Sequence, residues 1–173
     1  MSPFPAPADD PHLVAAPSGT VTFVWEGWNG ANWQIMSRTR GPQGGFRPVV
    51  PLAPAGANHE DPRIAVAPDG TTSVVWKNMR NRDRRVQIRT RPAGGAFGAT
   101  LTLSGHRADA TQDRVAMGPQ GQTAVAWAYG QAGRRALQFR ERPTGGAFEP
   151  VRTLSPYGGG EVDPQIAYGP DGT

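Results

Sequence analysis

The 173-residue sequence contains no cysteine, only one lysine and no long apolar run. Without cysteine, disulfides and thiolate metal sites are excluded, but this absence fits both an oxidising and a reducing compartment. No apolar run approaches the roughly 18 residues of a membrane span, and residues 1–10 carry proline and acid where a signal peptide needs cations and an apolar stretch. We therefore predict a soluble chain with no signal peptide and no membrane partner.

The sequence is rich in residues that interrupt regular structure, with 23 glycines and 18 prolines. This composition argues against long helices. The five tryptophans, six phenylalanines and three tyrosines are too many for a disordered tail, and a mass of 18.4 kDa suffices for one sizeable core. We expect one folded unit.

A repeat of 51 residues organises the chain, with related segments starting at residues 10, 61, 112 and 163. The segment DPRIAVAPDGTTSVVW at 61–76 shows the pattern most clearly. The expected organisation is a remnant at 1–9, three full repeats at 10–60, 61–111 and 112–162, and the first strand and turn of a fourth repeat at 163–173. The chain therefore looks cut in the middle of its pattern.

Each repeat predicts four short β-strands separated by turns. In the second repeat these are residues 63–67, 71–76, 86–91 and 99–104, with a Pro-x-Gly turn between the first two and a Gly-Gly turn between the last two. In the second strand, consecutive residues are apolar, and consecutive side chains point to opposite faces of a sheet. That strand should therefore be buried on both faces. The pattern predicts an all-β fold, a β-propeller of four-stranded antiparallel blades with three blades per chain, with a β-sandwich as the alternative. The first strand should be innermost.

Some positions are identical in the full repeats and should be structural. They include a tryptophan in the second strand and two arginines in the third. We expect these arginines to pack the blades by stacking on tryptophan or by pairing with backbone carbonyls. The structural positions are Trp25, Trp76, Trp127, Arg89, Arg91, Arg140 and Arg142.

The RxRPxGGxF segments at residues 89–97 and 140–148 are the most specific part of a family resemblance. With the repeat core, they resemble the roughly 50-residue repeats of secreted actinobacterial proteins with sialidase-like, usually six-bladed, propellers. This resemblance implies the fold and an extracellular location. It implies no chemistry, because Gly70 and Trp76 are too far apart for a sialidase Asp-box and the family's catalytic arginine triad, Tyr/Glu pair and Asp have no matching motifs.

Differences between the repeats fall in the connections between the second and third strands (26–33, 77–84 and 128–135) and between blades (53–60, 105–111 and 156–162). These connections should share one edge of the blades, as a binding face or as unconstrained loops. The tentative ligand-binding residues are Trp28, Trp33, Arg80, Arg82, Arg84 and Tyr129. The aromatic rings would stack and the arginines would meet an anionic group; the alternatives are one tryptophan folded over the rim of its own blade and, for the arginines, a solvated loop, which is the commoner explanation.

Catalytic motifs are absent from the sequence, which has no P-loop, GxSxG or HExxH. The three histidines occupy unrelated repeat positions, and His59, Glu60 and Asp61 are interpreted as surface polarity. We therefore expect no cofactor, no metal, no nucleic-acid partner and no enzymatic activity. The predicted function is a repeat module whose variable face binds a glycan or a protein; the alternative is a fragment of a sialidase-like glycoside hydrolase without its catalytic blades.

Three blades cannot close a propeller. The first and third blades would each leave one apolar sheet face exposed to water, and another part of the protein or a second chain must cover it. We predict a homodimer that closes a six-bladed ring, with a nine-bladed trimer as the alternative. Residues 163–173 repeat the innermost strand that residues 10–20 already supply. We expect one of the two copies to be displaced, and the C-terminal copy to act as a clasp against the partner chain.

Overall fold

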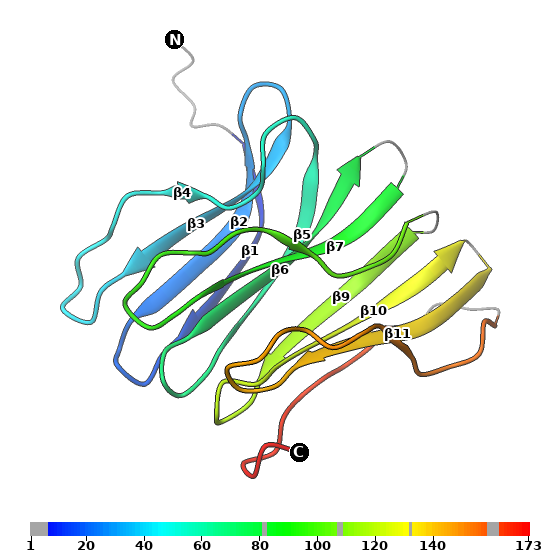
Figure 1. The fold of residues 1–173 in the computed structure, drawn as a ribbon. Coiled ribbons are helices and arrows are strands. Elements are labelled where there is room, and N and C mark those ends of the chain that lie inside the picture. Colours follow the sequence, from blue (N-terminus) through cyan, green and yellow to red (C-terminus); the bar gives the residue numbers. More distant parts are fainter. Residues whose placement is uncertain (1–6, 81–82, 107–108, 132, 159–162) are drawn as a thin grey trace.

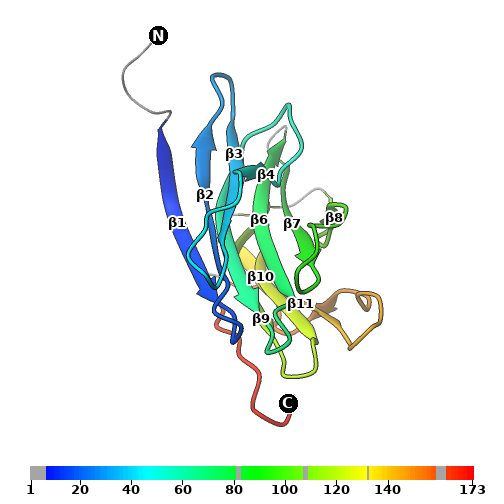
Figure 2. The same ribbon diagram turned by 90° about the vertical axis from the view of Figure 1, so that its left-hand side faces the viewer.

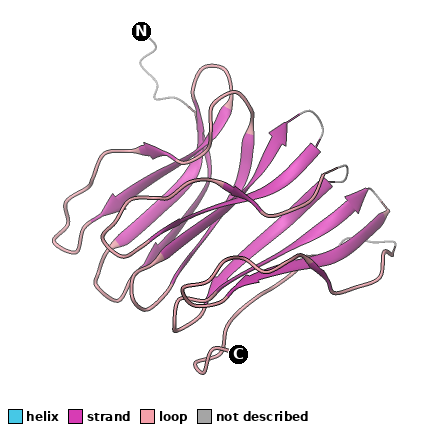
Figure 3. Ribbon diagram, viewed as in Figure 1, coloured by secondary structure: helices cyan, strands magenta, loops and turns pink. Residues whose placement is uncertain are grey.

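The fold consists of three four-stranded antiparallel sheets, which we call blades 1, 2 and 3 (Figure 1). A computed structural model describes residues 7–80, 83–106, 109–131, 133–158 and 163–173. These residues form strands, turns and loops but no helix, and hence none that could cross a membrane (Figure 3). The prediction of an all-β fold with three propeller-like blades is confirmed.

In every blade the strands pair in sequence order, so each strand lies beside its neighbour in the chain. Blade 1 contains β1 (Ala8–Ala15), β2 (Val21–Trp28), β3 (Trp33–Arg40) and β4 (Val50–Pro51). Blade 2 contains β5 (His59–Val66), β6 (Thr72–Arg80), β7 (Asp83–Arg91) and β8 (Leu101–Thr102). Blade 3 contains β9 (Asp109–Met117), β10 (Thr123–Gln131), β11 (Arg134–Arg142) and β12 (Arg152–Thr153).

The strands extend further than the sequence pattern predicts. Residues 77–84 are expected to be a variable loop, but β6 continues to Arg80 and β7 starts at Asp83. Likewise β5 starts at His59, inside the predicted between-blade connection. The reason is that backbone pairing continues past the apolar run that ends at Trp76, with Asn78 opposite Arg85 and Arg80 opposite Asp83. Much of the sequence variation therefore lies on strand ends.

Alternate residues of the second strand of each blade face opposite neighbours, as predicted. Val24 of blade 1 packs in one cluster with Val74 and Trp76 of blade 2. On the other face of the same strand, Val75 packs with Trp127 of blade 3. The core thus consists of two layers between three sheets, and Trp76 and Trp127 are completely buried.

The repeated arginines connect neighbouring blades. Arg91 of blade 2 donates hydrogen bonds of 2.8 Å to the hydroxyls of Thr22 and Thr39 in blade 1. One repeat later, Arg142 of blade 3 lies 3.4 Å from the Thr90 hydroxyl of blade 2. Pairing with backbone carbonyls is confirmed for Arg140, which donates to the Leu103 carbonyl of blade 2 at 3.3 Å and to the Glu149 carbonyl of its own blade at 2.6 Å.

The predicted stacking of these arginines on tryptophan is wrong. Among the described residues, the guanidinium groups of Arg91 and Arg142 lie over phenylalanine rings, Phe97 at 5.2 Å and Phe148 at 5.4 Å. Each phenylalanine follows the Gly-Gly turn of its own blade, which returns the chain beside β7 or β11. Trp76 and Trp127 point from the second strands of their blades into the core between blades.

Residues 163–173 form no strand, but they lie against blade 3. The Tyr168 hydroxyl donates to the Glu141 carboxylate at 2.8 Å, and Asp163 pairs with Arg114 of β9 at 2.6 Å. Their Pro-x-Gly turn has the same two backbone hydrogen bonds as the turns of the full repeats, from Gly169 to Thr173 and from Gly172 to Gly169.

Candidate functional site

The hairpins that join the second and third strands of the blades lie at one edge of the sheets, and the Pro-x-Gly turns lie at the opposite edge (Figure 1). This arrangement follows from antiparallel pairing in sequence order. Trp28 and Trp33 pair across β2 and β3 at the tip of the first hairpin. Their rings touch edge to face, with centroids 5.7 Å apart, and both side chains are half-buried. The indoles thus form one aromatic unit.

The next hairpin carries the predicted arginines. Arg80 is exposed at the end of β6, while Arg84 of β7 lies 3.4 Å from the Asp109 carboxylate of blade 3. Arg82 lies outside the described residues. Asp109 neutralises part of the positive charge of Arg84. Of the two predicted arginines that the structure describes, Arg80 is therefore the better placed to meet an anion.

Tyr129 has a structural contact that the sequence does not reveal. Its hydroxyl donates to the His106 carbonyl at 2.8 Å, and its ring packs against the core between blades 2 and 3. Ligand binding by Tyr129 remains a prediction.

A second group of functional side chains lies along the inner strands β1, β5 and β9. Each of these strands contains a β-bulge near the start of its repeat. At the bulges Asp10, Asp61 and Gln112 adopt positive φ angles of 43°, 53° and 55°. Such angles are uncommon for residues other than glycine, and bulges redirect side chains. The first position of every full repeat therefore has an unusual backbone.

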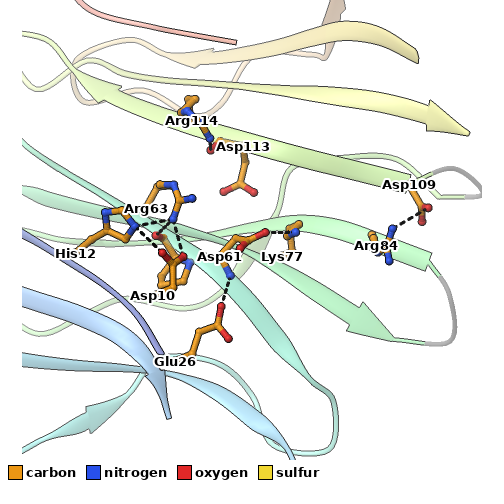
Figure 4. Close-up of polar contacts among 11 residues, drawn as sticks. Asp10, His12, Glu26, Asp61, Arg63, Lys77, Arg84, Asp109, Asp113 and Arg114 are labelled. Atoms are coloured by element: carbon orange, nitrogen blue, oxygen red, sulfur yellow. Dashed lines mark hydrogen bonds and ion pairs between the residues drawn. The ribbon is translucent and has the colours of Figure 1, made fainter. Parts of the chain in front are cut away.

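The bulges help to bring six charged side chains together, which we call the inner-strand cluster (Figure 4). It consists of Asp10, Glu26, Asp61, Arg63, Lys77 and Asp113. Asp10, Glu26 and Asp61 each offer a carboxylate oxygen, and these three oxygens lie within 4.8 Å of one another.

Several contacts hold the inner-strand cluster in place. Arg63 Nη1 donates to Asp10 Oδ2 at 2.7 Å, and Lys77 forms an ion pair with Asp61. Burial opposes ionisation of Asp10, but the Arg63 guanidinium holds the pKa of Asp10 below its ordinary value. Burial raises the pKa of Glu26, and the negative charges of Asp61 and other nearby acids raise it further. Glu26 accepts a hydrogen bond from the backbone N–H of Asp61 at 2.7 Å.

Asp113 of β9 is the most unusual member of the cluster. The residue is only 1% exposed, and neither carboxylate oxygen has a hydrogen-bond partner among the described residues. Its side chain points toward Arg63, Asp61 and Lys77 (Figure 4). Burial raises the pKa of Asp113 to about 7, because the attraction of Lys77 and Arg63 does not offset the loss of hydration.

The interpretation of His59 as surface polarity is wrong. The side chain is fully buried, its Nδ1 accepts a hydrogen bond from Trp76 Nε1 at 3.1 Å, and its Nε2 lies 3.0 Å from the Pro54 carbonyl. The Trp76 indole can only donate, so Nδ1 is the acceptor and Nε2 carries the proton. Both ring nitrogens are therefore used in the core, and burial lowers the pKa of His59.

Sequence reasoning did not find the inner-strand cluster, since its members come from different strands and repeats. The one available signal is the acid-rich start of the repeats, at residues 10, 61 and 113. No protein-family model and no curated protein matches this chain.

Proposed function

We propose that the chain is a non-enzymatic propeller module, of which two copies close a six-bladed ring that presents a glycan-binding face. The open face of blade 1 carries this proposal (Figure 2). Trp25 on this face is partly exposed, whereas its repeat equivalents Trp76 and Trp127 are completely buried between blades. Leu13 and Phe46 are 59% and 54% exposed. An apolar groove beside them is lined by Pro11, Phe23 and Trp25, and apolar surface of this kind favours a partner.

The repeat also indicates which surface would cover blade 1. Arg91 and Arg142 donate to hydroxyls of the preceding blade, at Thr39 and Thr90 respectively. Their equivalent in blade 1 is Arg40, which has no preceding blade within its own chain. The residue of blade 3 that corresponds to Thr39 and Thr90 is Glu141. In a ring of two chains, Arg40 of each copy would therefore meet Glu141 of the other, at the carboxylate that also accepts the hydrogen bond from Tyr168 of its own chain.

This pairing predicts the outcome of charge reversal. The parent chain should be a dimer of twice 18.4 kDa by light scattering at micromolar concentration. Arg40→Glu alone and Glu141→Arg alone each place like charges at both junctions and should weaken the dimer at least tenfold. An equimolar mixture of the two variants should form a heterodimer, because both of its junctions are again complementary.

Arg80→Glu is the matched control for this experiment, because it makes the same charge change at a hairpin tip away from the open face. A parent chain that stays monomeric would refute ring closure. Single variants that dimerise like the parent chain, or a mixture that gains no heterodimer, would refute the assigned junction.

For the binding face, we propose an anionic glycan bearing a uronic acid or sulfate. The Trp28 and Trp33 unit offers the aromatic surface, and Arg80 on the adjacent hairpin offers the cation. Changing both tryptophans to alanine should cost about 1 kcal/mol each, or roughly fivefold in affinity per ring. Binding should also weaken between about 0.05 and 0.5 M salt, because salt screens the arginine contacts.

A glycan array followed by titration calorimetry tests this proposal. Tyr157→Ala, which removes a half-exposed aromatic ring from another connection, is the control and should leave affinity unchanged. No binding at low salt would overturn the proposal. Equal binding by the double tryptophan variant, with an unchanged circular dichroism spectrum, would also overturn it.

A further inference from the structure

The inner-strand cluster has more negative than positive charge. Its four carboxylates, on Asp10, Glu26, Asp61 and Asp113, are accompanied by two cations, Arg63 and Lys77 (Figure 4). The nearby Arg114 is engaged with Asp163 at 2.6 Å. Like charges held close together repel one another, and an unpartnered buried carboxylate is costly. A further cation would reduce both penalties.

The spacing of the carboxylates suits one kind of cation. Calcium binds carboxylate oxygens at about 2.3–2.6 Å, so two of its ligands lie at most about 5 Å apart. One oxygen each of Asp10, Glu26 and Asp61 meets this limit, since all three lie within 4.8 Å of one another. Magnesium needs distances near 2.1 Å and an almost ideal octahedron, which would require these oxygens to move closer together.

The existing contacts leave room for such ligands. Glu26 uses Oε1 to accept the Asp61 N–H, Asp61 pairs with Lys77, and Asp10 contacts both Arg63 and His12. Each carboxylate has about four lone-pair positions, so one or two partners do not saturate it. Water would complete the six to eight oxygen ligands of calcium.

Asp113 provides an independent observation in favour of a cation. It is almost completely buried, has no partner for either oxygen among the described residues, and faces the same group from β9. Asp113 directly follows Gln112, the residue at the third bulge. Gln112 occupies the repeat position that Asp10 and Asp61 hold in the other two blades.

From these contacts we propose that Asp10, Glu26 and Asp61 bind a calcium ion between blades 1 and 2, and that the charge of Asp113 faces this ion from blade 3. The site lies within one chain, so it does not depend on ring closure or on glycan binding. Its role is structural, because it joins the inner strands of adjacent blades.

Calcium chloride added to the chelator-treated chain tests the site. Calorimetry should give a dissociation constant on the order of 10⁻⁴ M, since three carboxylates with competing ion pairs form a weak site. At 1 mM calcium the unfolding midpoint should rise by about 4 °C relative to sodium chloride of equal ionic strength.

Glu26→Gln should weaken calcium binding at least tenfold, while its amide oxygen still accepts the Asp61 N–H. Glu149→Gln makes the same change at an acid outside the cluster and should bind calcium as the parent chain does. Asp61→Asn is a second test, because asparagine tolerates the positive φ at this position. Unfolding in chelator shows which variants fold.

The proposal would be overturned if calorimetry detects no heat of calcium binding to the parent chain and calcium does not raise its unfolding midpoint. Undiminished binding by a folded Glu26→Gln or Asp61→Asn variant would overturn it as well. Loss of binding in either folded variant, with binding retained by Glu149→Gln, would support it.

Discussion

Replacing Trp76 by alanine should lower the free energy of unfolding by about 3–5 kcal/mol, which is the usual cost of removing a large aromatic side chain from a core. Trp76 is 0% exposed and packs between blades 1 and 2. Its indole N–H donates to His59 Nδ1 at 3.1 Å and lies 3.2 Å from Gln87 Oε1. The substitution therefore leaves a cavity and removes the donor from a buried histidine.

Urea denaturation followed by tryptophan fluorescence or circular dichroism measures this loss. Trp25→Ala is the matched control, since Trp25 occupies the same repeat position on the open face of blade 1. At concentrations where the chain is monomeric, Trp25→Ala should cost less than half as much as Trp76→Ala. Equal losses under these conditions would contradict the different burial of the two tryptophans. At higher concentrations Trp25→Ala should also weaken self-association.

The free energy of unfolding should decrease as pH rises from about 4 to about 7, because of Asp113. Burial raises the pKa of Asp113 in the folded chain from 3.8 to about 7, whereas the unfolded chain keeps an ordinary value. Between these values the folded state binds the proton and the unfolded state releases it, so unfolding becomes more favourable with increasing pH. A difference of about three pKa units corresponds to roughly 4 kcal/mol, fully developed above pH 7.

Asp113→Asn should remove most of this pH dependence and should be more stable than the parent chain at pH 8. The measurement is urea denaturation at pH 5 and pH 8 in the presence of a chelator, so that no divalent cation compensates the charge. Asp69→Asn, at an exposed turn, is the control and should keep the pH dependence of the parent chain. A variant with an unchanged pH profile would show that Asp113 does not control this behaviour.

The repeat and its alternating apolar residues were sufficient to predict the fold. Val74 and Val75 lie on opposite faces of β6, as the sequence pattern indicates, and the first strands of neighbouring blades, β1 with β5 and β5 with β9, contact one another. These predictions succeeded because strand pairing involves neighbours in sequence and because Pro-x-Gly turns have strong local preferences. The strand ends were less predictable, since backbone pairing continues through polar residues such as Arg84.

Burial and long-range contacts could not be predicted in the same way. Trp25 and Trp76 occupy one repeat position, but only the presence of a preceding blade determines which is buried. Similarly, His59 follows a connection rich in alanine, proline and glycine, yet its ring is buried and accepts a hydrogen bond from the Trp76 indole. The inner-strand cluster depends on backbone bulges, which turn Asp10 and Asp61 out of the regular alternation. No local residue pattern gives the distance between acids from different blades.

The Pro-x-Gly turn at the end of the chain bears on how the protein folds. Its two backbone hydrogen bonds match those of the other turns, although its flanking residues are in no sheet. The turn therefore needs no pairing of adjacent strands, and hairpins can nucleate at such turns before distant parts of the chain meet. Short loops between paired strands reduce the entropic cost of closing each hairpin. We therefore expect blades to form successively as the chain leaves the ribosome, with packing between blades following.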